Sequence, residues 1–539
     1  MLQMTRSGLA RIAAVVVTAC AISTISPAPA SAQAQMTGFR QAVAEYASDD
    51  RQLAKFYRES NFGAVWTGEG ADFLQRRKAL ITELSRVATH GLPQNRYDAA
   101  GLIEQMRTAK TPRDLGMLDV ALSKAYLSYA HDVQSGIVIP SSVDKGIVRE
   151  VNYHDRAELM SDLINGDAAE VMRALAPHSP EYARLRKEMM RLHDLIALGG
   201  WGATVPGKKL EPGDQGASVI KLRDRLIAMG YLNRSATMSY DKTIEAAVQQ
   251  FQSDHGLTPD GVAGTGTLTE INVPAEDRLK SVLVAMERER WMNMELGERH
   301  VLVNLTDFTA KIIDDGKVTF ETRSVIGMKQ LDRRSPEFSD VMEHMIINPT
   351  WNVPRSIAVK EYLPQLQKNP NAASHLRLTD VRGRLVDRGA VDFTQFNTRN
   401  FPFDMKQPPS SRNALGLVKF MFPNPQNVYL HDTPAKSLFG RESRAYSHGC
   451  IRLQQPFDFA YALLARQTDD PKGQFQSILK TGRETKVDLE LQIPVHIIYR
   501  TATIPAKGKA IYRRDVYGRD ALIWSELEQA GVVLGAVRG

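Results

Sequence analysis

Cysteine is scarce in this sequence: only Cys20 and Cys450 occur among its 539 residues. Two cysteines allow at most one disulfide, which excludes a scaffold held together by several disulfides. The metal-binding patterns H-E-x-x-H and C-x-x-C are also absent. The sequence therefore predicts neither a metal-dependent hydrolase nor a metal site of these types.

Charge of one sign is not concentrated either. Lys and Arg number 68 and Asp and Glu number 61, which gives a net charge of +7. Because this small excess is spread along the chain, it does not predict binding to nucleic acid. Apolar residues make up 43% and charged residues 24%, the composition of a globular protein, and the length predicts about two to four domains.

Residues 1–32 predict an exported protein. Two arginines and no acid precede and flank an apolar run, and the small-residue triplet Ala30-Ser31-Ala32 follows, as in a secretory signal peptide cleaved after Ala32. The run is shorter than the roughly 18 apolar residues of a membrane span, and no later stretch reaches that length. Val17-Thr18-Ala19-Cys20 also resembles a lipoprotein cleavage box, so a lipid anchor on Cys20 is the alternative.

The chain after the signal peptide begins with helical patterns. Residues 33–209 carry apolar residues at helical spacing and predict a helical scaffold domain. Residues 210–274 predict three short helices, the second of them capped by Asp241. This unit resembles the peptidoglycan-binding domain family in three patterns: G-x-x-V-x-x-L-x-x-x-L from Gly216, A-V-x-x-F-Q from Ala247 and G-L-x-x-D-G-x-x-G from Gly256. The resemblance implies a module that docks on wall glycopeptide.

The pattern changes to strands at Val301. Short apolar runs such as Val301–Leu305 alternate with turns, and Asp315-Gly316 predicts a hairpin. Residues 299–500 are therefore expected to form a mostly-β domain within a multidomain α+β protein. Residues 355–412 are polar and punctuated by proline, which predicts a lid over a groove. A connecting helix is expected over residues 275–298 and a C-terminal extension over residues 501–539.

Two segments of the β domain hold residues suited to acyl transfer. If the signal peptide is removed, Cys450 is an unpaired thiol, which pairs between chains, does chemistry or is buried and inert. The imidazole of His431 can take the proton of this thiol, and a helix expected near residues 457–464 can favour the anion. Gly449 allows close approach of a substrate, so the Cys450 N–H and a neighbouring N–H can hold an oxyanion. Arg452 is placed to receive a substrate carboxylate.

These residues carry a second resemblance. Ser447-His448-Gly449-Cys450, with His431 upstream, resembles the catalytic signature of the L,D-transpeptidase family. Asn348–Pro354, Met286–Trp291 and Asp515–Gly518 resemble segments of the large, periplasmic, multidomain branch of that family. The resemblance covers nearly all of the chain after the signal peptide. It implies a mostly-β L,D-transpeptidase domain in a periplasmic protein.

The resemblance also implies roles for single residues. Cys450 is the nucleophile, His431 is the general base and then acid, and the backbone carbonyl of Asp432 orients the imidazole. The candidates for substrate binding are Gly449, Arg452, His448, Ser447, Tyr429 and Trp351. A plain loop residue is an equal alternative for His448. Packing in the groove or the core is expected for Tyr429 and Trp351, and Ser447 is expected to set the turn.

The reaction implied by the resemblance is acyl transfer on peptidoglycan. Cys450 attacks the third residue of a tetrapeptide stem, D-Ala leaves, and the thioester passes to the amine of a second stem to form a 3-3 cross-link in cell wall biogenesis and cell shape. Neither a metal nor a cofactor is required. Members of the family also use envelope proteins or D-amino acids as acceptors, so the acceptor stays open. Carbapenems are expected to acylate the cysteine.

Two other interpretations are open. Ser142–Lys145, Ser411–Asn413 and Lys480–Gly482 fit the motifs of serine D,D-transpeptidases in the right order, although such short patterns arise readily by chance. The first two motifs are also expected in different domains. The other interpretation is a wall-binding protein without catalytic activity, and the intact pair of His431 and Cys450 argues against it.

Overall fold

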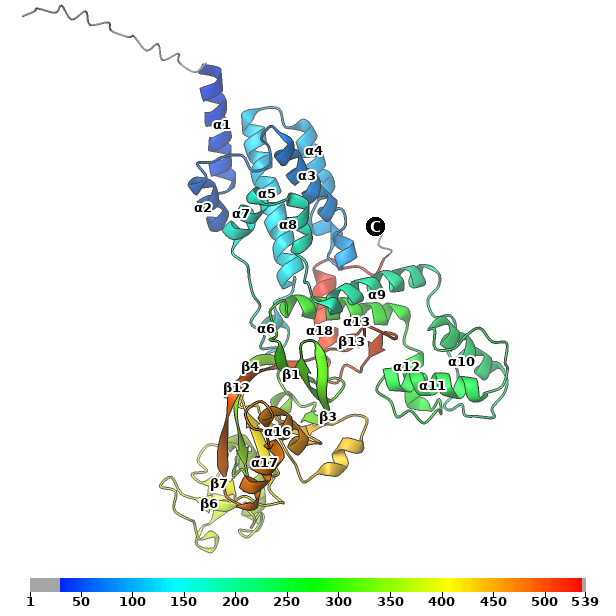
Figure 1. Cartoon of the computed structure of the whole chain (residues 1–539), viewed down its shortest axis with the longest axis vertical. Coiled ribbons are helices and arrows are strands. Elements are labelled where there is room, and N and C mark those ends of the chain that lie inside the picture. The colour runs from blue at the N-terminus through cyan, green and yellow to red at the C-terminus, as the bar shows by residue number, and fades with distance from the viewer. Residues whose placement is uncertain (1–29, 536–539) are drawn as a thin grey trace, which may run out of the picture.

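The computed structural model describes residues 30–535 of the chain. Residues 1–29, which include most of the predicted signal peptide and the alternative anchor at Cys20, lie outside the described residues. Within the described residues, no helix is both long and apolar enough to cross a membrane. Figure 1 shows a helical region at one end, a β domain at the other and a small helical domain projecting to one side.

The helical region is built around one long helix, α5 (Pro112–Ser135). A capping box starts this helix, because the side chain of Thr111 accepts from the Asp114 N–H while the carboxylate of Asp114 accepts from the Thr111 N–H. Its buried face shares one apolar core with the surrounding helices. These are α1 (Ala30–Tyr46), α2 (Arg51–Glu59), α3 (Ala71–Leu84), α4 (Ala99–Thr108), α7 (Arg156–Asn165) and α8 (Ala168–Ala174). The short helix α6 (Pro140–Val143) packs through Val143 against the core around α13 instead.

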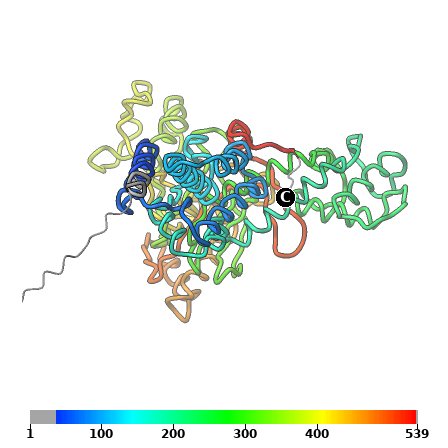
Figure 2. The backbone as a smooth tube through the Cα atoms, turned by 90° about the horizontal axis from the view of Figure 1, so that it is seen from above, coloured from blue at the N-terminus to red at the C-terminus, as the bar shows by residue number. Residues whose placement is uncertain are grey.

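The small domain consists of α10 (Ala217–Ala228), α11 (Lys242–Asp254) and α12 (Thr265–Ile271). Asp241 caps α11 as predicted, since its carboxylate accepts from the Thr243 and Ile244 N–H groups at 3.0 and 3.1 Å. The three helices bury a core of their own. Seen from above in Figure 2, the domain extends away from the rest of the molecule.

The junction between these parts is α13 (Ala275–Trp291), which packs against α9 (Pro180–Ala197). Four consecutive charged residues of α13, Glu287–Arg290, are buried. Burial of charge is costly unless each group is paired. The pairs are Arg290 with Glu287 at 2.7 Å, Arg288 with Glu337 at 2.5 Å and Glu289 with Arg500 at 2.5 Å.

The predicted C-terminal extension packs on the same helix. It forms β13 (Ala502–Thr503), β14 (Ile511–Tyr512) and α18 (Arg519–Gln529). Ile523 and Leu527 of α18 are buried with Leu279 and Val282 of α13. Because Glu337 and Arg500 belong to the β domain, α13 connects the scaffold, the C-terminal segment and the β domain.

The β domain is a nine-stranded sheet with the order β10-β3-β11-β9-β8-β4-β12-β1-β2. Since β2 also pairs with β3, the sheet closes on itself around an apolar core. The predicted hairpin is confirmed: Asp315 and Gly316 have φ of 48° and 73°, as a type I′ turn requires. The strands are β1 (Arg299–Asn304), β2 (Thr309–Asp314), β3 (Lys317–Gly327), β4 (Phe338–Ile347), β8 (Val418–Met421), β9 (Leu430–His431), β10 (Ala445–Ser447), β11 (Ile451–Leu453) and β12 (Thr485–Ile498). The helices α16 (Pro456–Leu464) and α17 (Pro471–Lys480) contribute Phe459 and Phe475 to the same core.

The segment predicted as a lid folds into a small unit, called here the insertion (residues 351–415). It contains a three-stranded sheet of β5 (Trp351–Asn352), β7 (Asp404–Gln407) and β6 (Arg377–Thr379), with α14 (Arg355–Ile357), a π-helical turn (Ala358–Tyr362) and α15 (Leu363–Lys368). Its apolar side chains form a separate core that includes Leu366, Phe393 and Phe401. The polar composition of the segment therefore conceals a packed unit.

Candidate active site

Three neighbouring strands place three polar side chains in one row. The register pairs Lys419 of β8 with His431 of β9, and His431 with Arg452 of β11. Side chains alternate along a strand, so the neighbours Phe420 and Leu430 point to the other face and join the apolar core. His431 therefore lies between two cations on the polar face of the sheet.

Cys450 lies in a tight turn between β10 and β11. Gly449 has a φ of 115°, a conformation that side chains rarely adopt. The hydroxyl of Ser447 accepts from the Gly449 N–H at 3.2 Å and donates to the Cys450 carbonyl at 2.5 Å, which fixes the turn. Within residues 30–535, the Gly449 N–H is thus occupied and the Cys450 N–H has no acceptor.

The expected support of Cys450 by a helix N-terminus is wrong. The residues after Cys450 form β11, and α16 begins only at Pro456. The field of a helix terminus falls off within its first turn, and a strand separates this one from the thiol. The cations of the neighbouring strands act on Cys450 instead.

The imidazole of His431 has a defined tautomer. Its Nδ1 lies 2.5 Å from the backbone carbonyl of Asp432. A carbonyl only accepts hydrogen bonds, so Nδ1 carries the hydrogen in the neutral ring. The backbone of Leu415 makes a second hydrogen bond to the ring. Burial, followed by the charge of Arg452, lowers the pKa of His431 to about 3. The ring is therefore neutral near pH 7, which is the form that a general base needs.

The thiol of Cys450 is also neutral at rest. Burial raises its pKa, while hydrogen bonds from Tyr429 and the charges of Arg452 and Lys419 act in the opposite direction. The Sγ atom donates to the carbonyl of Asn427 at 3.6 Å. A protonated thiol beside a neutral imidazole is thus the resting state, and proton transfer has to accompany attack on a substrate.

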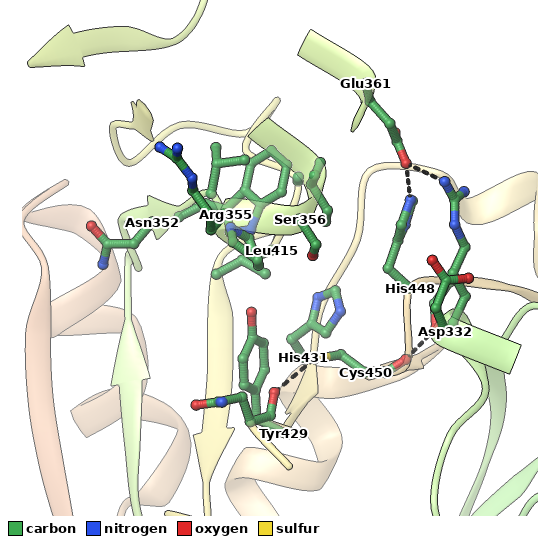
Figure 3. A pocket seen from close by; sticks show the side chains of 18 of the residues that line it. Asp332, Asn352, Arg355, Ser356, Glu361, Leu415, Tyr429, His431, His448 and Cys450 are labelled. Atoms are coloured by element: carbon green, nitrogen blue, oxygen red, sulfur yellow. Dashed lines mark hydrogen bonds and ion pairs between the residues drawn. The ribbon is translucent and has the colours of Figure 1, made fainter. Parts of the chain in front are cut away.

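These groups lie at the base of a pocket of about 650 Å³. Figure 3 shows the His431 ring and the Cys450 side chain beside one another, with residues of the insertion across from them. Seven of the predicted site residues line this pocket: Trp351, Tyr429, His431, Ser447, His448, Cys450 and Arg452. Gly449 and Asp432 adjoin it, and the carboxylate of Asp432 turns away to accept from the Leu417 N–H and the Lys436 ammonium.

The remaining predicted residues differ in what they contact. Trp351 is 8% exposed and belongs to the core of the insertion. The ring of Tyr429 lies edge-on to His431 with 5.6 Å between centroids. The guanidinium of Arg452 has a buried Nε without a hydrogen-bond partner among the described residues, so this side chain can still take an acceptor from a ligand.

The sequence did not point to Glu361, which joins the insertion to the catalytic turn. One of its carboxylate oxygens lies 2.6 Å from Nε2 of His448 and 2.7 Å from a guanidinium nitrogen of Arg333. The neighbouring Lys360 pairs with Asp332 at 2.7 Å. Figure 3 shows Glu361 reaching His448 from the opposite wall. Only the folded insertion brings these residues together, so no local pattern could have revealed them.

The rival serine motifs lie in different parts of the structure. The exposed Ser142 donates to the Ile139 carbonyl in the scaffold. Asn413 is buried and its amide donates to backbone carbonyls, among them that of Pro349 in the β domain. Lys480 ends α17. None of the three lines the pocket that holds Cys450.

Three family models match the chain. Residues 298–481 match the L,D-transpeptidase catalytic domain, residues 215–271 match the family described as "Putative peptidoglycan binding domain", and residues 51–189 match the family described as "Scaffold domain". The first two matches lie largely within the segments expected to form the catalytic and wall-binding units.

A curated relative from Haemophilus influenzae, named "Putative L,D-transpeptidase", is 28% identical over 242 residues, which are 44% of this chain and 48% of the relative. The match thus spans about half the length of that relative. Solved L,D-transpeptidases from Xylanimonas cellulosilytica and Stackebrandtia nassauensis are 13% and 14% identical and cover 54% and 55% of this chain and 98% and 97% of their own, with TM-scores of 0.18 and 0.21. On the family matches, the chain carries an L,D-transpeptidase catalytic domain together with a peptidoglycan-binding domain.

Proposed function

We propose that this protein is a periplasmic L,D-transpeptidase that forms 3-3 cross-links in peptidoglycan through a thioester on Cys450. The observation that carries the proposal is the pairing of a thiol with an imidazole of fixed tautomer. Nδ1 of His431 is bound to the Asp432 carbonyl, and the ring lines the same open pocket as Cys450. The predicted signal peptide supports export, and the insertion supplies the wall that acts as a lid.

In the first half-reaction, the thiol attacks the carbonyl of the third stem residue, the L-centre of diaminopimelate. The S–C bond forms as the thiol proton moves to Nε2 of His431, and the free Cys450 N–H donates to the oxyanion. The peptide bond to D-Ala then breaks, and His431 returns the proton to the amine of the leaving D-Ala. The product is an acyl thioester on Cys450.

In the second half-reaction, the side-chain amine at the D-centre of another stem attacks the thioester. His431 takes a proton from the amine and returns it to the leaving sulfur, so an amide forms and the thiol is restored. These steps balance without a metal or a cofactor. The unpartnered Nε of Arg452 supports a role in holding a stem carboxylate near the reacting bond.

The neutral resting pair has a consequence for selectivity. Because burial holds the thiol protonated and the imidazole uncharged, the nucleophile forms only when a carbonyl is positioned to accept it. An exported thiol that rests as a thiolate would be open to oxidation. The neutral resting pair therefore suits an enzyme whose thiolate forms only after a stem peptide has bound.

The test supplies two disaccharide tetrapeptides to the purified chain and follows the products by mass spectrometry. We expect loss of D-Ala, an acyl adduct on Cys450 and a cross-linked dimer. The Cys450→Ala variant is expected to form none of these, while Ser142→Ala should behave as the unchanged chain does. Full cross-linking by Cys450→Ala would overturn the proposal, and an adduct on Ser142 would favour the serine mechanism.

The same experiment distinguishes the acceptors. A second stem, a free D-amino acid and a lysine-containing peptide that represents an envelope protein are offered in competition to the preformed thioester. We expect the stem dimer to dominate. Preferential transfer to the lysine peptide would assign the enzyme to protein attachment, and a chain that binds the stem without forming a thioester would be a wall-binding protein.

A further inference from the structure

A second cavity, of about 600 Å³, lies where three parts of the molecule meet. One wall is the loop after α11, residues 255–259, which belongs to the peptidoglycan-binding domain. The β domain supplies the loop before β10, residues 440–444, and the C-terminal segment supplies residues 513–516. This cavity is called here the basic groove.

The parts that form the basic groove are joined by specific contacts. Thr258 of the peptidoglycan-binding domain donates through its N–H and its hydroxyl to Glu442, both at 2.9 Å. Arg513 of the C-terminal segment donates to the carbonyl of Asp254. The ring of Tyr512 lies over that of His255 with 5.9 Å between centroids. These contacts hold the three walls of the basic groove in fixed positions relative to one another.

The groove carries an excess of positive charge. Three acids line it, and each already accepts hydrogen bonds: Asp307 from Thr309, Glu442 from Thr258 and Asp515 from Tyr499. Six cations line it, namely Arg323, Lys329, Arg441, Arg444, Arg513 and Arg514. Of these six, only Arg514 has a carboxylate at ion-pair distance among the described residues, Glu270 at 3.8 Å.

Two of these cations, Arg323 and Arg444, repel each other. Burial, followed by the charge of Arg323, lowers the pKa of Arg444 to about 10. Arg444 is buried, and its guanidinium donates to backbone carbonyls such as those of Ser324 and Phe308. Six cations against three acids leave the groove with a net positive charge, which favours binding of an anion.

The groove borders the candidate active site on two sides. Lys329 lines the groove, whereas Asp332 and Arg333, three and four residues later, line the pocket that holds Cys450. Arg444 lines the groove immediately before β10, and Ser447 lines the pocket at the end of that strand. Three residues of extended chain span about 10 Å, so the two cavities are close neighbours along β10.

We infer that the basic groove is a second substrate site, which binds the carboxylates of a stem peptide on the wall strand held by the peptidoglycan-binding domain. A stem peptide of this kind is a flexible polyanion, and the cations supply fixed partners for its carboxylates. The inference rests on the proposed function for the identity of the ligand. In this inference the basic groove binds the peptidoglycan polymer, and Cys450 carries out the acyl transfer.

The test measures binding of a synthetic, soluble tetrapeptide stem with free carboxylates in the Cys450→Ala background, where no thioester forms. We expect two peptides per chain, one in each cavity. Lys329→Glu combined with Arg441→Glu reverses two exposed charges of the groove and should weaken one of the two binding events by roughly tenfold or more. That event should also weaken with added salt and with the fully amidated peptide.

The matched control reverses two exposed lysines elsewhere, Lys78→Glu with Lys472→Glu, which makes the same change in net charge. It should retain both binding events. Unchanged affinities of both binding events in the groove variant, or an equal weakening in the control, would overturn the inference. So would tight binding of polyphosphate at the groove with no binding of the peptide, because the ligand would then be a phosphate polymer.

Failure of this inference is distinguishable from failure of the proposed function. Release of D-Ala from the soluble stem depends on Cys450 and is measured separately in the chain that retains its thiol. The groove variant is expected to release D-Ala from this short donor at the unchanged rate but to act more slowly on intact wall polymer. Equal rates on both substrates would contradict the groove as a docking site, whereas absence of release in every chain would contradict the transpeptidase.

Discussion

The hydroxyl of Ser335 donates a 2.6 Å hydrogen bond to the carbonyl of Gly449, the residue before Cys450. Ser335 is fully buried, and its hydroxyl also accepts from the Gly327 N–H at 3.0 Å. Tyr517 completes the contact: its hydroxyl accepts from the Ser335 N–H at 3.2 Å and donates to the Gly327 carbonyl at 2.6 Å. The C-terminal segment thus holds the turn that presents Cys450.

Removing the hydroxyl of Tyr517 tests whether this residue supports the turn before Cys450. Tyr517→Phe leaves the Ser335 N–H and the Gly327 carbonyl without a partner in a buried place, which costs about 1–3 kcal/mol locally. We expect the rate of thioester formation on Cys450 to fall by about tenfold, because small misplacements of a reacting group are costly. Rapid-quench mass spectrometry of the acyl adduct measures this rate.

The control for this variant is Tyr512→Phe. Tyr512 is also buried in the C-terminal segment, but its hydroxyl donates to Glu188 of the scaffold at 3.2 Å, away from the turn. This variant should lose stability while keeping its rate of thioester formation. If both variants lose the same amount of activity, Tyr517 acts only through general stability.

Buried histidines predict sensitivity to acid. Burial lowers the pKa of His90, His255 and His431 to about 3 and that of His496 to about 4. The unfolded chain titrates these groups near 6.5, so between about pH 6.5 and pH 3 it binds more protons than the folded chain. Their contribution to stability is present above about pH 6.5 and is lost as the pH falls toward 3.

The measurement is the urea midpoint at about pH 7.5 and about pH 4.5. We expect a lower midpoint in acid, because each of the four histidines removes on the order of 2–3 kcal/mol from the free energy of unfolding. His255→Gln keeps a donor for the Phe251 carbonyl that Nδ1 now contacts at 2.8 Å. This variant should show a smaller difference between the two pH values, and an equal difference would remove His255 from the explanation.

The contact between Glu361 and His448 is predicted to hold the insertion against the turn before Cys450. Glu361→Gln removes the charge that faces both His448 and Arg333, a pair of half-exposed contacts each worth at most about 1 kcal/mol. We expect faster amide hydrogen exchange across the π-helical turn and α15, and a higher KM for the donor stem. Glu343→Gln, on β4 and outside the pocket, is the control. Unchanged exchange across the insertion would show that Glu361 does not hold it.

The sequence predicted those features that depend only on residues near one another in the chain. The Asp315-Gly316 turn and the cap at Asp241 depend on neighbouring residues, and both are as expected. Glu361 and Tyr517 reach the site only because the insertion folds and the C-terminal segment returns to β3. No spacing in the sequence encodes such contacts, since each depends on the packing of segments far apart in the chain.

The predicted helix near residues 457–464 is present as α16, but its expected support of the Cys450 thiol was wrong for a related reason. Residues 451–453 pair with β3 and β9 as a strand, and the register of that pairing, not a helix terminus, decides which charges reach the thiol. Alternation along β8 could have indicated Lys419, because Val418 and Phe420 on either side of it are fully buried. The register that sets Lys419 opposite His431 could not be read from the sequence.

Lys419 offers the sharpest test of this row of charges. Burial raises the pKa of the Cys450 thiol, and the ammonium of Lys419 lowers it by favouring the thiolate. Lys419→Met keeps the length of the side chain and removes the charge, so the pKa of the thiol should rise further. At a fixed pH below that pKa, a smaller fraction of the chain is thiolate, and alkylation of Cys450 by iodoacetamide should slow by several-fold. Lys406→Met on the exposed face of β7 is the control and should alkylate at the original rate. Faster alkylation of Lys419→Met would show that the Lys419 side chain blocks access of the reagent to the sulfur and does not promote formation of the thiolate.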